Sequence, residues 1–112
     1  MSARKEEVMT ERKLVAALTE VCEELKQDDT GFSWLTHIGH WRSPTIVAVF
    51  NTQAQLTTAL SRKWDIDFIN RVNIALDTVK SSAHACRFTS EEACRTKNGG
   101  DWDSHLSQID LH

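Results

Sequence analysis

The longest periodic hydrophobic pattern lies near the start of the chain and predicts a helix over residues 5–27. Its apolar residues recur at spacings of three and four, which places them on one face of a helix. They are Leu14, Val15, Leu18, Val21, Cys22 and Leu25. Gly31 follows shortly after and is suited to a left-handed conformation beyond the helix end. The chain therefore begins with a helix that has one apolar face to bury.

Two extended segments come next, and a turn at Pro44 separates them. Residues 32–41 are aromatic and partly alternating, and we expect Phe32 and Trp34 on the same face. Residues 45–50 are an unbroken apolar run rich in β-branched side chains, which is typical of a central strand covered on both faces. The simplest arrangement of the two segments is an antiparallel hairpin.

The second half of the chain is predicted to hold two helices, a strand and a short helix. The two helices span about residues 51–62 and 65–80, because apolar residues recur there at helical spacing. A third strand covers residues 84–88. The segment Thr89-Ser90-Glu91-Glu92 is a capping-box signature with Thr89 as the cap, and the helix that it opens ends at Asn98-Gly99-Gly100.

These elements indicate an α+β fold in the order α-β-β-α-α-β-α, with a small, mostly antiparallel three-stranded sheet packed against helices. The tail over residues 101–112 is expected to dock loosely. A chain of 112 residues that is 40% hydrophobic and 26% charged is typical of one compact domain. We expect that domain to span residues 1–112, with 1–6 and 107–112 frayed.

The cysteine count and the apolar runs predict where the protein acts. Three cysteines make an odd number, which does not suit a secreted disulfide scaffold. The N-terminus lacks the apolar stretch of a signal peptide, and the longest apolar run, Ile46 to Phe50, is far shorter than the ~20 residues of a membrane span. We therefore expect a cytoplasmic protein that does not enter a membrane.

The charge balance argues against a nucleic-acid-binding protein. There are 13 basic and 16 acidic residues, for a formal net charge of -3, and the basic residues are scattered. A local basic face could still assemble from Arg42, Arg62, Lys63 and Arg71. A transcriptional or nucleic-acid-binding regulator is therefore the alternative interpretation.

Histidines and cysteines are the candidates for metal binding or catalysis. His84 and Cys86 share a face of a predicted strand, and Cys94 lies in the next helix. No Cys-x-x-Cys or His-Glu-x-x-His spacing is present, so we expect small buried thiols and neither a metal nor a cofactor. A second alternative is a small hydrolase or metal-dependent enzyme that uses these residues together with His37. No cysteine has the glycine-flanked turn typical of a nucleophile, which disfavours that alternative.

Residues at the ends of elements are the candidates for binding. Asn51 and Thr52 follow the central strand, where polar groups often contact ligands, but both are also ordinary helix caps. Four tryptophans occur without a tyrosine, and we expect Trp34 in the core. The other three lie at element ends, where tryptophan either covers the core edge or anchors an interface. The interface candidates are Trp41, Arg42, Trp64 and Trp102.

Several segments between residues 14 and 106 carry a resemblance to a known family. They are Leu18–Glu24, Gly31–His37, Val49–Thr52, and Phe88–Cys94 with Gly99–Trp102. They resemble small uncharacterised bacterial proteins, some of which are labelled Fis-type transcriptional regulators. The resemblance implies no activity, ligand or catalytic residue, and the family has an aspartate where this chain has Asn51. Fis-type regulators are nearly all helical and end in a basic helix-turn-helix, which the acidic segment Asp101-Trp102-Asp103 does not match.

The sequence therefore predicts a small α+β protein that binds another macromolecule, in the first place a protein, without chemistry of its own. The absence of catalytic motifs and the tryptophans at element ends favour this interpretation. Because a central strand that is apolar on both faces needs cover on both sides, a homodimer across a sheet face or edge is also consistent with the pattern.

Overall fold

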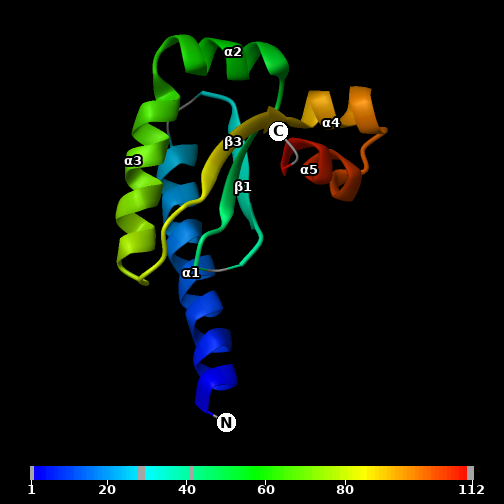
Figure 1. Ribbon diagram of the computed structural model, residues 1–112. Helices are drawn as coiled ribbons and strands as arrows, with labels where there is room; N and C mark the ends of the chain where they lie inside the picture. The colour runs from blue at the N-terminus through cyan, green and yellow to red at the C-terminus, as the bar shows by residue number, and fades with distance from the viewer. Residues whose placement is uncertain (1, 28–29, 41, 111–112) are drawn as a thin grey trace.

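The computed structural model describes residues 2–27, 30–40 and 42–110, with side chains between residues 11 and 108 of these ranges. Within them the chain forms five helices and three strands (Figure 1). In chain order they are α1 (Ser2–Lys26), β1 (Phe32–Ile38), β2 (Thr45–Phe50), α2 (Gln53–Ser61), α3 (Trp64–Asp77), β3 (Ala85–Ser90), α4 (Glu91–Asn98) and α5 (Trp102–Asp110). The predicted α+β class and the order of the first seven elements are confirmed.

The three strands form one mixed sheet in the order β1-β2-β3. β1 and β2 make the expected antiparallel hairpin, whereas β3 pairs with β2 in parallel. The parallel pairing arises because α2 and α3 lie between β2 and β3 in the chain and return it to the starting end of β2. Every residue of β2 is buried, which confirms a central strand covered on both faces.

One face of the sheet packs against α1 and α3, which lie side by side (Figure 1). Ile46, Ala48 and Phe50 of β2 point into this core, where the apolar stripe of α1 meets them. Phe68 on α3 is fully buried, and its ring stacks on the ring of Trp64 with 5.1 Å between the centroids. This layer holds most of the buried apolar side chains of the domain.

Phe32 and Trp34 were expected on the same face of β1, but a β-bulge near the start of the strand places them on opposite faces. The register shifts between these two residues, so that Phe32 pairs with Phe50 and Trp34 pairs with Val49. Phe32 therefore lies in the core beneath α1 and α3, whereas Trp34 points to the opposite face. Simple alternation placed the two rings together, because it cannot anticipate the extra residue of a bulge.

The opposite face of the sheet is covered by the C-terminal part of the chain. Residues 102–110, expected as a loosely docked tail, form the helix α5. Trp34, Val49 and Thr89 lie opposite one another across the three strands. Trp102 contacts Trp34 at one end of this row, with ring centroids 4.8 Å apart. Together with α4, the helix α5 supplies the cover that a two-sided apolar strand requires.

The caps of the shorter helices agree with the sequence in one case and differ in another. Thr52 caps α2 as predicted, and its side chain and that of Gln55 form a complete capping box. The cap of α4 is Ser90, whose hydroxyl accepts a hydrogen bond from the backbone N–H of Ala93 at 3.0 Å. The prediction of Thr89 as that cap was wrong, because β3 continues through Ser90 and turns the Thr89 side chain toward α5.

Candidate functional site

Two of the tryptophans proposed as interface anchors are resolved in very different places. Trp64 is only 8% exposed, and its ring packs among Phe32, Phe50 and Phe68. It is therefore a core residue of this domain, with no surface to offer a partner. Trp102 is half-buried at the start of α5. Trp41 lies outside the described residues.

Trp34 and Trp102 attach the C-terminal helices to the sheet. Besides its contact with Trp102, Trp34 donates a hydrogen bond from Nε1 to Glu91 Oε1 at 3.0 Å. Each indole thus has a partner within the domain, and Trp102 also packs edge-on against His105. We therefore assign this aromatic pair to the packing of α4 and α5 onto the outer face of the sheet.

The residues of the suggested basic face do not gather in one place. Arg62 and Lys63 precede α3, whereas the backbone carbonyl of Arg42 accepts a hydrogen bond from Ser82 beyond the other end of α3. A 14-residue helix is about 21 Å long, so the ends of the set are far apart. Between them, Arg71 forms ion pairs with Glu24 at 3.1 Å and with Asp67 at 2.9 Å, which neutralise its charge.

The polar residues that follow β2 hold the backbone together. The backbone N–H of Asn51 donates to Gly31 at 3.0 Å, and its carbonyl accepts from the N–H of Glu92 at 3.3 Å. Thr52 caps α2, as described above. Both residues therefore have structural contacts that account for their place in the chain.

The cysteines and His84 do not form a metal site. Among the described residues no group of three or more histidine, cysteine or acidic side chains is arranged to hold a metal ion. Cys94 is fully buried, Cys86 is half-buried and His84 is exposed. Burial raises the pKa of both the Cys86 and the Cys94 thiol, and Asp101 raises that of Cys94 further. A raised thiol pKa lowers the fraction of thiolate, which is the form that attacks substrates or binds metals.

One chain of polar side chains joins three elements at the outer face of the sheet. His105 Nδ1 lies 2.7 Å from Asn98 Oδ1, and His105 Nε2 lies 2.7 Å from Thr89 Oγ1. Because the amide oxygen of Asn98 can only accept, the proton of the neutral imidazole is on Nδ1. Nε2 then accepts a hydrogen bond from the Thr89 hydroxyl. Sequence analysis missed this chain, since its members lie on β3, α4 and α5.

The connectivity of this chain is that of a hydroxyl, a base and a residue that orients the base, as in nucleophilic catalysis. The burial of its side chains argues against such a role. Thr89 is 5% exposed and His105 is 4% exposed, so neither presents an atom to a substrate. Burial also lowers the pKa of His105, with Lys97 adding to the effect, which keeps the ring neutral. We assign the chain to the attachment of α5 to β3 and α4.

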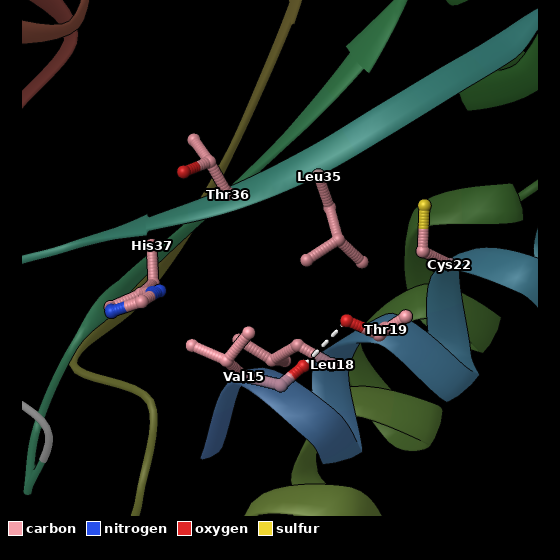
Figure 2. Close-up of a pocket in the computed structure, with 7 residues that line it drawn as sticks. All are labelled: Val15, Leu18, Thr19, Cys22, Leu35, Thr36 and His37. Carbon is pink, nitrogen blue, oxygen red and sulfur yellow. Dashed lines mark hydrogen bonds between the residues drawn. The ribbon is translucent and has the colours of Figure 1, made fainter. Parts of the chain in front are cut away.

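A groove lies between α1 and the outer edge of β1. Figure 2 shows the side chains of α1 and β1 that face one another across a pocket of about 280 Å³. They are Val15, Leu18, Thr19 and Cys22 from α1, and Leu35 and His37 from β1. Thr36 also lines the pocket, but its side chain points away from α1. The Thr19 hydroxyl donates to the Val15 carbonyl at 2.7 Å, so it is satisfied within its own helix (Figure 2).

The groove continues along α1 into a second pocket of about 460 Å³. Glu11 and Arg12 line this part, and it shares Val15 and His37 with the first pocket. Val15 is 50% exposed, which is unusual for a β-branched apolar residue beside a core. We call the two pockets together the edge groove. It combines an apolar floor with charged residues at one end.

The edge groove lies beside an open edge of the sheet. Among the described strands, β1 pairs only with β2, so its other side carries backbone donors and acceptors without a strand partner. Among the sequence-predicted site residues that the structure describes, only His37 lines this groove, and it entered only as an alternative catalytic residue. The signal for this groove in the sequence was Val15, which belongs to the apolar stripe of α1 but does not pack in the core of the domain.

No helix in the described part of the chain is long and apolar enough to cross a membrane. Comparison with protein-family models, with curated proteins and with solved structures finds no match for this chain.

Proposed function

We propose that this chain is a non-enzymatic, cytoplasmic module that binds a protein through the edge groove. The observation that carries the proposal is the position of an apolar groove directly beside the open edge of β1. An extended segment of a partner could pair with the β1 backbone and cover Val15 at the same time. Burial of half-exposed apolar side chains next to newly paired backbone groups is a common basis of protein recognition.

Two further features support binding over catalysis. The only arrangement with the connectivity of a catalytic relay in the described residues, Thr89 with His105 and Asn98, is buried and faces the other side of the sheet. The thiols of Cys86 and Cys94 have raised pKa values.

The positive charges of the nucleic-acid alternative are separated by the length of α3, since Arg62 and Lys63 precede this helix and Arg42 lies beyond its other end. The pairing of Arg71 with two carboxylates weakens them further.

The test is affinity capture from a lysate of the source cell at low salt, with the captured protein and nucleic acid both identified. Thr19→Arg places a long charged side chain in the edge groove. Ala16→Arg makes the same change at an exposed position of α1 that does not line the groove. We expect a near-stoichiometric protein with the wild type and with Ala16→Arg, and its loss with Thr19→Arg.

Two outcomes would contradict the proposal. A protein retained equally by all three baits would place the binding surface elsewhere. Nucleic acid that is recovered at low salt and lost as salt is raised would favour the regulator instead, because phosphate contacts weaken steeply with salt.

A further inference from the structure

We propose that the occupant of the edge groove is a second copy of this chain, so that α1 and β1 form a two-fold symmetric dimer. This inference rests on the proposed function, since it names the partner of the same face.

The charges and apolar residues along α1 are arranged so that they complement themselves. Glu11, Val15, Leu18, Cys22 and Lys26 follow one another at spacings of four, three, four and four, which places them on one stripe of the helix. When two copies of the helix are placed antiparallel about a point between residues 18 and 19, each residue meets a defined counterpart. Glu11 meets the second copy's Lys26, and Val15 meets the second copy's Cys22. Leu18 and Thr19 lie nearest the axis. Opposite charges thus come together at both ends, with the apolar pairs of Val15 and Cys22 between them and the axis.

The strand β1 is suited to the same symmetry. Leu35 is the middle residue of Phe32–Ile38, and the strand forms one edge of the sheet. An antiparallel pairing of two copies about Leu35 would join two three-stranded sheets into one sheet of about six strands. It would also satisfy the backbone groups along both open edges at once.

A single two-fold axis serves both elements, and this is the strongest support for the dimer. Leu18 and Thr19, at the midpoint of the α1 stripe, line the same pocket as Leu35, at the midpoint of β1 (Figure 2). An axis perpendicular to the sheet at this point would relate both the strands and the helices. An isologous interface needs such agreement, because one rotation must superpose every pair of contacts. An unrelated partner requires no such coincidence.

The other side of α1 is already occupied within the subunit. Glu24 pairs with Arg71 of α3, and Val21 packs in the shared core. The stripe from Glu11 to Lys26 borders this core: Leu18 belongs to it and is 3% exposed, whereas Glu11, Val15 and Lys26 are exposed and Cys22 is half-buried. Pairing with a second copy would bury Val15, which is 50% exposed, and Cys22, which is half-buried.

The first test is the mass of the purified full-length chain in solution, measured by sedimentation equilibrium over about 1–100 μM, a range in which weak specific dimers dissociate. We expect a dimer for the wild type and for Ala16→Arg, and a monomer for Thr19→Arg, where two arginines would meet near the axis. Circular dichroism shows whether each variant is folded.

Glu11→Lys should raise the dimer dissociation constant about tenfold by placing like charges together. The double variant Glu11→Lys with Lys26→Glu should restore the wild-type dissociation constant.

The second test fixes the register of the two helices. Val15→Cys places a thiol opposite the second copy's Cys22, so mild oxidation should give a covalent dimer on a non-reducing gel. The two positions cannot join within one helix, because seven residues span about 10 Å and a disulfide needs Cα atoms within ~7 Å. Ala16→Cys is the matched control and should give no such band.

The results separate this inference from the proposed function. A wild-type monomer at all concentrations overturns the dimer, as does an equal yield of covalent dimer from Val15→Cys and Ala16→Cys. If the lysate capture still recovers a protein that Thr19→Arg loses, the proposed function stands with a different partner. If the chain is monomeric and the capture is also insensitive to Thr19→Arg, both proposals fail.

Discussion

Thr89 Oγ1 lies 2.7 Å from His105 Nε2, and this hydrogen bond joins the strand β3 to the helix α5 across 16 residues of sequence. Both side chains are buried, and Asn98 holds the other nitrogen of the ring. The position of the C-terminal helix therefore depends on a neutral histidine, because a protonated ring in this place would carry a buried charge next to Lys97.

Stability should fall with decreasing pH because of His105. Burial lowers its folded pKa below the ordinary value of 6.5, so the unfolded chain binds a proton first as the pH falls. The contribution is complete well above pH 6.5 and is lost as the pH is lowered through 6.5 toward the folded pKa. Urea unfolding at pH 8 and pH 5.5 measures it. His105→Gln should reduce the difference between the two pH values, whereas His84→Gln, at an exposed position, should leave it unchanged.

Removal of the Thr89 hydroxyl should destabilise the domain. Thr89→Val keeps the β-branched shape but leaves His105 Nε2 buried without a donor, which costs about 1–3 kcal/mol in the free energy of unfolding. Thr89→Ser keeps the hydroxyl and is expected to cost less. Equal losses for the two variants in urea unfolding would show that the hydrogen bond contributes little.

The aromatic cluster beneath α3 should be the most sensitive part of the core. Phe68 is fully buried and stacks on Trp64, so Phe68→Ala should cost about 3–5 kcal/mol through lost contacts and a cavity. Ile74 on the same helix is 69% exposed, and Ile74→Ala should change stability by no more than about 0.5 kcal/mol. If Phe68→Ala does not fold, Phe68→Leu should still cost about 1–3 kcal/mol. A loss at Phe68 no larger than that at Ile74 would contradict this packing.

Gly31 and Gly39 have nearly the same backbone angle but different surroundings. Their φ values are +89° and +90°, so alanine at either position should cost about 1–2 kcal/mol in conformational strain. A Cβ at Gly31 would also overlap the side chain of Gln55, whereas a Cβ at Gly39 would meet nothing within 4 Å. Gly31→Ala should therefore be the more costly in thermal unfolding. Adding Gln55→Ala to Gly31→Ala should recover less than the full loss, because Gln55 completes the α2 capping box.

The sequence predicted the helices and the central strand well because their signals are local. The stripe of α1 and the β-branched run of β2 repeat at the period of the element that they form. Thr52 likewise caps α2 by contacts within three residues. Predictions failed where a local signal had a competitor. Thr89 has the residue type of a cap, but Ser90 occupies that position because β3 runs one residue further.

The candidate site was the part that the sequence predicted least. The hydrogen bond from Trp34 to Glu91 spans 57 residues. The edge groove is lined by Thr19 of α1 and Leu35 of β1, which belong to different elements. Nothing in the residues around Trp64 indicates that the ring enters the core; it does so because α3 packs on the sheet. By itself the sequence determined which segments are helical or extended, since periodicity and capping act over a few residues. The tertiary structure alone decided which faces meet and which edge stays open, because those depend on contacts between distant segments.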